Sequence, residues 1–150
     1  MRPVVSPTSN DGVTQKRLTL ASTSIYRWVM LKLPFDPIER SRKIERIVVR
    51  NNRRKYYRFR YTRYYGGIVT ADTVGCNLLC AYCWNYFKNL RPEKHGTFYS
   101  PEDVAENLLK IARTKSCYLF RISGAEPILS RDSAEHLAGV MKLTGGAEKV

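Results

Sequence analysis

The hydrophobic positions of the chain follow two periods, and the change between them predicts where strands and helices lie. Tyr57, Phe59 and Tyr61 alternate with polar residues, which is typical of a strand with one buried face. Ile44, Val48 and Val49 precede the pair Asn51-Asn52, so we expect a β-hairpin that turns at the two asparagines. The β-prone run at residues 68–71 predicts a short strand, which could be buried.

A helical period begins after Ser100, which can cap the first free amides, with Pro101 in the first helical position. The apolar stripe of this helix consists of Val104, Leu108, Ile111 and Ala112. Residues 117–122 predict a second strand, which the turn at residues 123–127 ends. A further helix is expected from Ser130 or Asp132 to about Leu143, before Gly145-Gly146.

This order of elements predicts an α/β fold of the type βαβα, with parallel strands joined by right-handed crossovers. Two strands cannot close a barrel, and residues 147–150 resemble the approach to a third strand. We therefore expect a partial barrel that belongs to the N-terminal part of a longer protein. The predicted divisions are a mobile lead-in (1–24), a basic extension with the hairpin (25–63) and the α/β core (64–150).

Composition restricts the class of protein. Hydrophobic residues make up 43% of the chain and aromatic residues 11%, which is enough to form a buried core. No run of about 18 apolar residues occurs, which argues against a membrane-spanning helix. The start shows no secretion signal, so we expect a cytoplasmic location. In that reducing compartment, four cysteines act as metal ligands or buried apolar side chains more often than they form disulfides.

The charge is concentrated in the N-terminal part. The formal net charge is +13, and residues 1–66 hold 16 basic and 4 acidic side chains, against 10 and 9 in residues 67–150. Eleven of the basic residues lie between Arg40 and Arg63, with one acidic residue and several tyrosines. Such a strand can contact RNA or an acidic protein. The favoured alternative is a hairpin whose tyrosines pack on the domain while its arginines face solvent.

Three cysteines stand close together in the loop after the strand at 68–71. Cys76, Cys80 and Cys83 have the spacing C-x3-C-x2-C. A loop with such short spacers can turn three thiolates toward one centre, and thiolates favour zinc, copper or an iron–sulfur cluster. A cluster with three protein ligands keeps one iron open to a substrate or cofactor.

This spacing, with Tyr82 just before the last cysteine, resembles the signature of the radical S-adenosylmethionine (radical SAM) enzymes. The segment Ser123-Gly124-Ala125-Glu126-Pro127, at the end of the next predicted strand, resembles the Gly-Gly-Glu-Pro turn of the same family. The resemblance covers residues 64–150 and implies the first βα units of a radical SAM barrel. Within the family, the sequence near the cysteines looks most like that of pyruvate formate-lyase activating enzymes.

The resemblance also implies the cofactors and the reaction. The three cysteines would bind a [4Fe–4S] cluster, and S-adenosyl-L-methionine would chelate its fourth iron. In the family, the reduced cluster passes one electron to the sulfonium, which releases methionine and a 5′-deoxyadenosyl radical that abstracts hydrogen from a substrate. A reduced ferredoxin or flavodoxin would supply the electron, and the substrate is a protein, an RNA or a small molecule.

The second motif is expected to hold the cofactor together with Tyr82. The tyrosine would lie near the adenine, and the turn that begins at Ser123 would bind the amino group through the backbone of Gly124, Ala125 and Glu126, stiffened by Pro127. Ala125 departs from the glycine usual at its position, and a left-handed φ there would cost about 1–2 kcal/mol. Glu126 can also be read as a general base, although the turn role is favoured.

Other interpretations of these residues remain open. His95 could complete a Cys3His zinc site in a non-catalytic module that binds nucleic acid. Otherwise we expect His95 and His136 at the surface or in helix caps. Cys117 is expected to be a small buried apolar side chain, and Trp84 to pack in the core.

Overall fold

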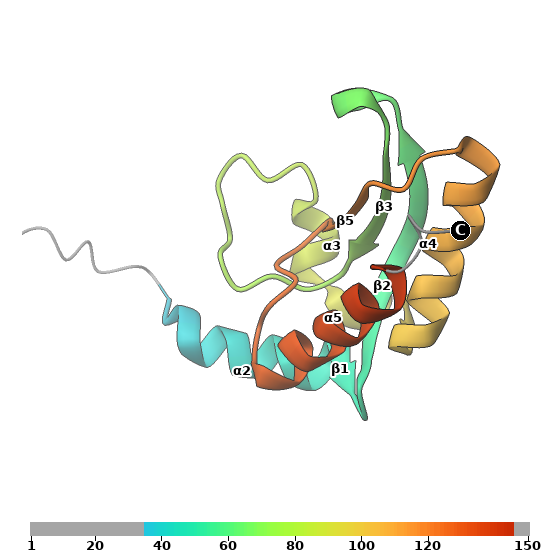
Figure 1. Cartoon of the computed structure of the whole chain (residues 1–150). Coiled ribbons are helices and arrows are strands. Elements are labelled where there is room, and N and C mark those ends of the chain that lie inside the picture. The colour runs from blue at the N-terminus through green and yellow to red at the C-terminus, as the bar shows by residue number, and fades with distance from the viewer. Residues whose placement is uncertain (1–34, 146–150) are drawn as a thin grey trace, which may run out of the picture. The chain divides into compact units, whose positions relative to one another are not determined.

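A mixed β-sheet with helices packed against it forms the part of the chain that the computed structural model describes, residues 35–145 (Figure 1). Along the chain the elements are α2 (Pro37–Val48), β1 (Val49–Arg50), β2 (Arg53–Thr62), β3 (Ile68–Thr73), α3 (Tyr86–Leu90), β4 (Thr97–Tyr99), α4 (Pro101–Lys115), β5 (Phe120–Ser123) and α5 (Arg131–Thr144). Two short 3-10 helices, η1 and η2, cover Tyr64–Gly66 and Pro92–Lys94. The lead-in predicted for residues 1–24 and the strand expected near residues 147–150 lie outside the described residues.

The sheet is built on β2 and β3. β2 pairs antiparallel with β1, β3 and β4, and β3 pairs in parallel with β5. The strand order is β1-β2-β3-β5, with β4 attached to β2. The predicted mixed α/β class is confirmed, and the hairpin strand β2 shares one sheet with the predicted core strands.

The parallel β-α-β unit expected from the sequence is present, because α4 lies between the parallel strands β3 and β5. As predicted, Ser100 caps α4: its hydroxyl accepts a hydrogen bond from the Asp103 amide, and the Asp103 carboxylate accepts one from the Ser100 amide. Ser130 caps α5 in the same way. The predicted second strand begins later than expected, at Phe120, and Cys117 before it packs against the core.

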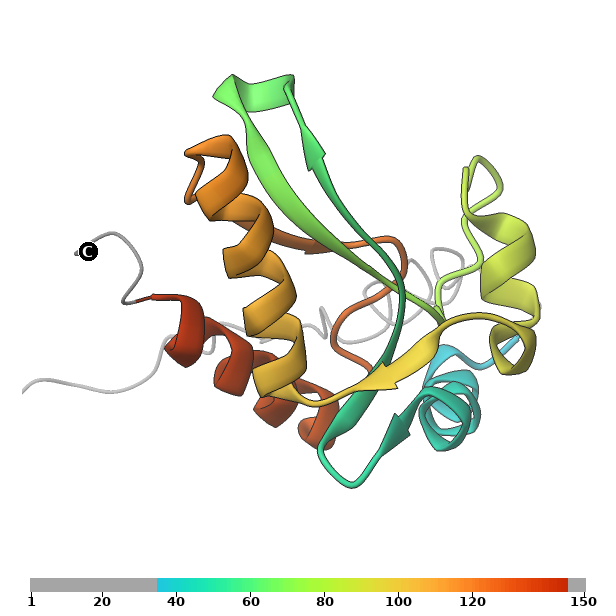
Figure 2. The same cartoon turned by 90° about the vertical axis from the view of Figure 1, so that its right-hand side faces the viewer.

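α4 and α5 cover one face of the sheet (Figure 2). Alternate side chains of the strands reach this face, so that Phe59 and Tyr61 of β2 pack there, as the favoured interpretation of the hairpin expected. The buried core consists of Tyr56, Val69, Ala71, Val104, Leu108, Ala112 and Val140. None of the helices in residues 35–145 is long and apolar enough to cross a membrane.

A tight turn joins β1 to β2 where the sequence predicts a hairpin, but the arm before the turn is mostly helical. Asn51 and Asn52 form the turn, with φ angles of 50° and 56°, the left-handed pair that tight hairpins favour. The arm before it contains only two strand residues, because Ile44 and Val48 belong to α2. Their separation of four residues is a helical spacing, which the hairpin prediction wrongly combined with Val49 into one strand.

α2 begins with a cap that the sequence analysis missed. The Asp36 carboxylate accepts hydrogen bonds from the amides of Ile38 and Glu39, and Pro37 occupies the first helical turn. Ile44 and Val48 are buried against Val74 and Leu129, in a second small core that lies apart from the first. The helix therefore supports the chain at the point where β3 ends.

His136 of α5 is buried, so the expectation that it lies at the surface or in a cap is wrong. Only 1% of the side chain is exposed. Its Nδ1 donates to the carbonyl of Asn52 at 2.8 Å, and its Nε2, 3.1 Å away, accepts from the Tyr56 hydroxyl. These contacts explain the burial, because the ring joins the hairpin turn to the core and both nitrogens have partners.

Replacing His136 with glutamine should make the stability of the protein depend less on pH below about pH 6.5. Burial lowers the pKa of His136 below its usual value of 6.5, so the unfolded chain binds a proton more readily than the folded chain does. The stability from the neutral ring is complete above about pH 6.5 and declines as the pH falls below it. Thermal unfolding between about pH 5 and about pH 8 measures the slope. The His95→Gln variant controls for loss of an imidazole, and equal slopes in wild type and His136→Gln would contradict this assignment.

Candidate metal centre

The loop that carries the cysteines leaves β3 through a glycine that no other residue could replace without strain. Gly75 has a φ of +88°, and a Cβ at this position would lie 2.7 Å from Ile44 Cγ2 and 3.0 Å from Val48 Cγ1. The Nε of Arg40 donates to the carbonyl of Cys76 at 3.2 Å. The start of the loop is thus fixed against α2.

The three cysteines lie on one short loop as half-buried free thiols. The loop is ordered by backbone hydrogen bonds from the Cys83 amide to the Cys80 carbonyl and from the Tyr86 amide to the Cys83 carbonyl. The Leu78 amide lies 3.4 Å from the Cys76 sulfur, and Asn89 Nδ2 lies 3.6 Å from the Cys83 sulfur. Two of the three sulfurs therefore each have an N–H group beside them within the loop.

The thiols are not gathered around a common point in this structure. Within residues 35–145, no three side chains of the types Cys, His, Asp and Glu are close enough together to hold a metal ion. The half-buried His95, directly after η2, therefore also stands outside any such group. The donor set still fits an iron–sulfur cluster or zinc by its chemistry, since three partly accessible thiols on one loop can turn toward the same ion.

The second motif begins where β5 ends. Gly124 has a φ of +92°, and a Cβ there would lie 2.7 Å from the Thr73 carbonyl oxygen and 2.9 Å from the Thr73 nitrogen. Ala125 is not among the described residues with a positive φ. The left-handed position of the turn is thus Gly124, and the strain considered for Ala125 does not arise.

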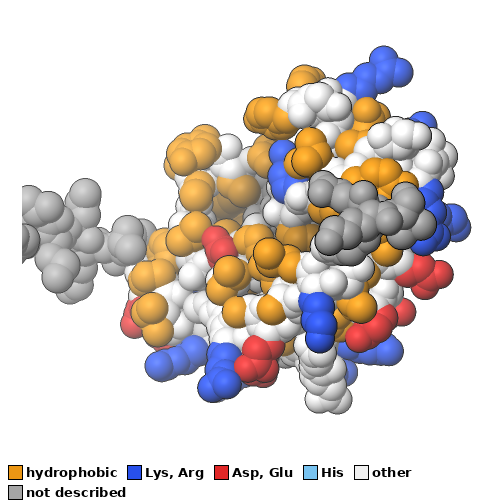
Figure 3. Space-filling model, in the orientation of Figure 1, with side chains coloured by type: hydrophobic (Ala, Val, Ile, Leu, Met, Phe, Trp, Pro, Cys, Tyr) orange, Lys and Arg blue, Asp and Glu red, His pale blue; other side chains and the backbone are white. Residues whose placement is uncertain are grey.

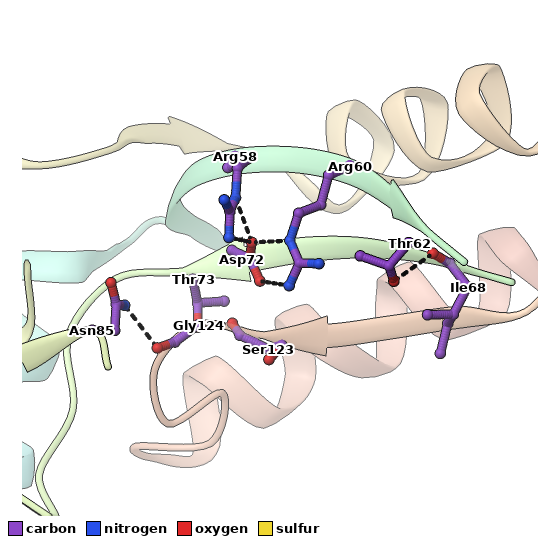
Figure 4. Close-up of polar contacts among 9 residues, drawn as sticks. All are labelled: Arg58, Arg60, Thr62, Ile68, Asp72, Thr73, Asn85, Ser123 and Gly124. Atoms are coloured by element: carbon purple, nitrogen blue, oxygen red, sulfur yellow. Dashed lines mark hydrogen bonds and ion pairs between the residues drawn. The ribbon is translucent and has the colours of Figure 1, made fainter. Parts of the chain in front are cut away.

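Three side chains from earlier parts of the chain hold this turn, and Figure 4 shows two of them, Thr73 and Asn85. Thr73 Oγ1 donates to the carbonyl of Ser123 at 2.9 Å, and Asn85 Nδ2 donates to the carbonyl of Gly124 at 2.7 Å. The third is Arg54, whose Nη2 donates to the carbonyl of Glu126 at 2.8 Å. Asn85 comes from the cysteine loop, so its hydrogen bond joins the two sequence motifs directly.

Arg54 is a charged side chain in the interior beside both motifs, with 1% of its surface exposed. Burial lowers its pKa to about 10, and the negative charges that Tyr56, Glu126 and Cys76 can carry oppose this shift. The guanidinium therefore remains charged at neutral pH, close to the turn and to the first cysteine.

Glu126 contributes to the shape of the turn through its carboxylate. Oε1 accepts a hydrogen bond from the Ile128 amide at 3.1 Å. This contact is local, two residues along the chain, and is typical of a turn residue. It favours the turn interpretation of Glu126 over the general base.

The aromatic residues of the cysteine loop are exposed. Tyr82 is 91% exposed and Trp84 is 66% exposed, so the expectation that Trp84 packs in the core is wrong. The buried residue of this segment is its neighbour Asn85, because the amide reaches Gly124 and turns the indole outward. The guanidinium of Arg58 lies 5.9 Å from the centre of the Trp84 ring. Figure 3 shows hydrophobic side chains around a hollow on this side of the molecule.

Asp72 lies at the end of β3 and is completely buried. Its Oδ2 accepts from Arg58 Nε at 2.8 Å and from Arg60 Nε at 2.7 Å, and Arg60 Nη2 lies 3.3 Å from Oδ1 (Figure 4). Asp72 is paired with Ser123 in the sheet, so the carboxylate is next to the start of the turn. Arg58 and Arg60 thus pair with a buried charge, whereas the sequence analysis expected arginines that simply face solvent.

Both sequence motifs lie within a segment that matches a known protein family. A family model described as the Radical SAM superfamily matches residues 71–149, which is more than half of the 150 residues. The chain belongs to the radical SAM superfamily. Neither a curated protein nor a solved structure matches the chain. The matched segment contains the three cysteines and the whole of the Ser123–Pro127 turn, and it begins within β3.

Three residues near the radical SAM motifs escaped the sequence analysis: Asn85, Arg54 and Asp72. Asn85 stands two positions after Cys83, but nothing in its type or spacing indicates a contact with a turn 39 residues later. Arg54 is one of many arginines in a basic stretch, and Asp72 is a single acid in an apolar strand. A carboxylate inside an apolar run was the available signal, because a buried acid needs a partner.

Substitution of Gly124 by alanine should destabilise the protein more than substitution of Gly66. Both glycines have a positive φ, of +92° and +79°, but a Cβ on Gly66 meets nothing within 4 Å. Gly66→Ala should lower the free energy of unfolding by about 1–2 kcal/mol through backbone strain alone. Gly124→Ala should lose a further 1–3 kcal/mol or so, because the Cβ must displace Thr73. Urea unfolding measures both, and equal losses would disprove the close approach.

Asn85→Ala should loosen the Ser123–Pro127 turn without unfolding the sheet. It removes the hydrogen bond to Gly124 and leaves a partly buried carbonyl without this donor, which costs about 1–3 kcal/mol locally. Hydrogen exchange should accelerate at the amides of residues 124–128 and stay unchanged in α4. Asn107→Ala, which removes a side-chain bond to the Asp103 carbonyl within α4, is the matched control. Unchanged exchange in the turn of Asn85→Ala would contradict the link.

Proposed function

We propose that this radical SAM chain binds a [4Fe–4S] cluster through Cys76, Cys80 and Cys83 and S-adenosyl-L-methionine at the Ser123–Pro127 turn. The observation that carries the proposal is the 2.7 Å hydrogen bond from Asn85 to the Gly124 carbonyl. It brings a loop with three soft ligands beside a turn whose backbone carbonyls can accept hydrogen bonds. A structural zinc site would need no such neighbour.

The turn is suited to an amino group because its carbonyl oxygens can accept hydrogen bonds. The carbonyls of Gly124 and Glu126 each accept one bond, from Asn85 and Arg54, and each retains a second lone pair. The carbonyl of Ala125 accepts none among the described residues. The side chains that hold the turn therefore fix its shape and keep acceptors available, with Pro127 restricting the backbone after it.

The exposed Tyr82 ring would lie near the adenine when the cofactor is bound. It is one residue before Cys83, so it moves with the loop that would close on the cluster. An exposed aromatic ring can bury apolar surface by stacking on the face of another ring. When bound, the two cofactors supply the electron transfer and the reductive cleavage that yields methionine and a 5′-deoxyadenosyl radical; the protein positions and shields them.

We also propose an electron donor, a cellular location and possible substrates for the reaction. We expect a reduced ferredoxin or flavodoxin as electron donor and a cytoplasmic location. The likeness to pyruvate formate-lyase activating enzymes rests on the sequence near the cysteines and would make a protein backbone the substrate. The basic segment between Arg40 and Arg63 would instead suit an RNA substrate or an acidic partner protein.

Metal content and electron paramagnetic resonance of the anaerobically reconstituted, reduced chain test the proposal. We expect iron and sulfide in equal amounts and a [4Fe–4S] signal that changes when S-adenosyl-L-methionine is added. Alanine at Cys76, Cys80 or Cys83 should each abolish most of the signal, since each would remove one of three ligands. Cys117→Ser is the matched control, because Cys117 packs against the core.

The metal content also distinguishes the proposed enzyme from the alternative, a zinc-bound module that binds nucleic acid. One tightly bound zinc per chain without sulfide would refute the enzyme and support the nucleic-acid-binding module. A cluster signal that does not respond to the cofactor would refute the role of the turn and leave the cysteine assignment in place.

A further inference from the structure

The face of the sheet that α4 and α5 do not cover has an ordered set of polar side chains. Because Val69 and Ala71 point into the core, the alternate residues Thr70 and Asp72 of β3 belong to the opposite face. Pairing between strands extends this face into two rows. One row is Arg58, Asp72 and Ser123, and the next is Arg60, Thr70 and Arg121.

The charges in these rows do not balance. Arg58 and Arg60 share the carboxylate of Asp72, which has no exposed surface. Arg121 lies on β5, the strand that flanks β3 on the side away from β2. Its guanidinium has no ion pair within residues 35–145. Three cations thus stand around one anion, and the unmatched charge lies in the row with Thr70.

Two buried polar atoms in that row lack a hydrogen-bond partner among the described residues: Thr70 Oγ1 and Arg121 Nε. Thr70 has no exposed surface. A buried hydroxyl and a buried guanidinium nitrogen without partners each cost free energy, so native proteins rarely leave them unpaired. Both atoms can donate a hydrogen bond, and Arg60, on the other side of Thr70, adds a second charged donor group.

We propose that Arg60, Thr70 and Arg121 bind a carboxylate or phosphate group of the substrate. An anion above Thr70 would accept from the hydroxyl and from a guanidinium on each side, since paired strands lie about 4.8 Å apart. It would also bring the charge of the two rows closer to balance. Asp72 has a positioning role here, because it holds Arg60 through two nitrogens and leaves its remaining amino group for the ligand.

Because of its location, we assign this anionic group to the substrate. Thr70 lies in the row next to Arg58-Asp72-Ser123, and Ser123 is the first residue of the turn, so the two sites adjoin on one face of the sheet. The assignment to substrate rests on the proposed function. Anion binding itself does not, because no cysteine takes part in it.

Calorimetric titration of the full 150-residue chain, free of cluster and cofactor, tests the site at low ionic strength. Pyrophosphate and succinate are separate probes, which distinguish a phosphate site from a carboxylate site. We expect one of them to bind at one site per chain, with affinity reduced about tenfold or more in Arg121→Gln and about two- to tenfold in Thr70→Val. Thr70→Val removes the hydroxyl but keeps the shape of the side chain. It therefore tests the site independently if Arg121→Gln fails to fold.

Arg131→Gln is the matched control for loss of one positive charge, since Arg131 lies on α5 with 89% of its side chain exposed. It should bind like the wild type. Equal binding by Arg121→Gln and Arg131→Gln, or no binding of either probe by the wild type, would overturn the proposal. Neither result depends on a cluster, so a failure here and a failure of the proposed function are separate.

Discussion

The parallel pairing of β3 with β5 is the constraint on which the candidate site depends. The register sets Asp72 opposite Ser123, so both strands end at the same edge of the sheet. Each strand continues directly into one of the radical SAM motifs, as is usual for functional loops at the carboxyl ends of parallel strands. A shift of the register would separate Asn85 from Gly124 and Thr73 from Ser123. The α4 crossover, packed on the core, maintains this register.

Close backbone contact then sets the shape of both motifs. Gly75 lets the cysteine loop leave against α2, and Gly124 lets the turn lie directly on Thr73. Because these contacts involve backbone or core atoms, little adjustment is available on either side. The fixed part of the site is therefore its base, whereas the aromatic side chains of the loop, such as Tyr82, extend into solvent.

The sequence contained most of the fold in local signals and both motifs of the site in a family resemblance, but not the contacts that join the motifs. Period, capping and turn residues predicted α4, α5, β3 and the hairpin, because these features act within a few residues. Family resemblance located the two motifs, and the helix α2 was missed although its spacing was visible in Ile44 and Val48. The burial of His136 and the positions of Asn85 and Arg54 depend on contacts between distant segments, which no local pattern encodes.

The buried carboxylate of Asp72 ties its evolution to that of its two arginines. Loss of the acid alone would leave Arg58 and Arg60 side by side without a counter-charge, and loss of the arginines alone would leave a buried anion. Each single substitution destabilises the protein, whether the acid or an arginine is replaced first. Residues 58, 60 and 72 should therefore change together during evolution. Aligned natural sequences would then show correlated substitution at 58, 60 and 72, with an uncharged residue at 72 accompanied by fewer arginines on β2.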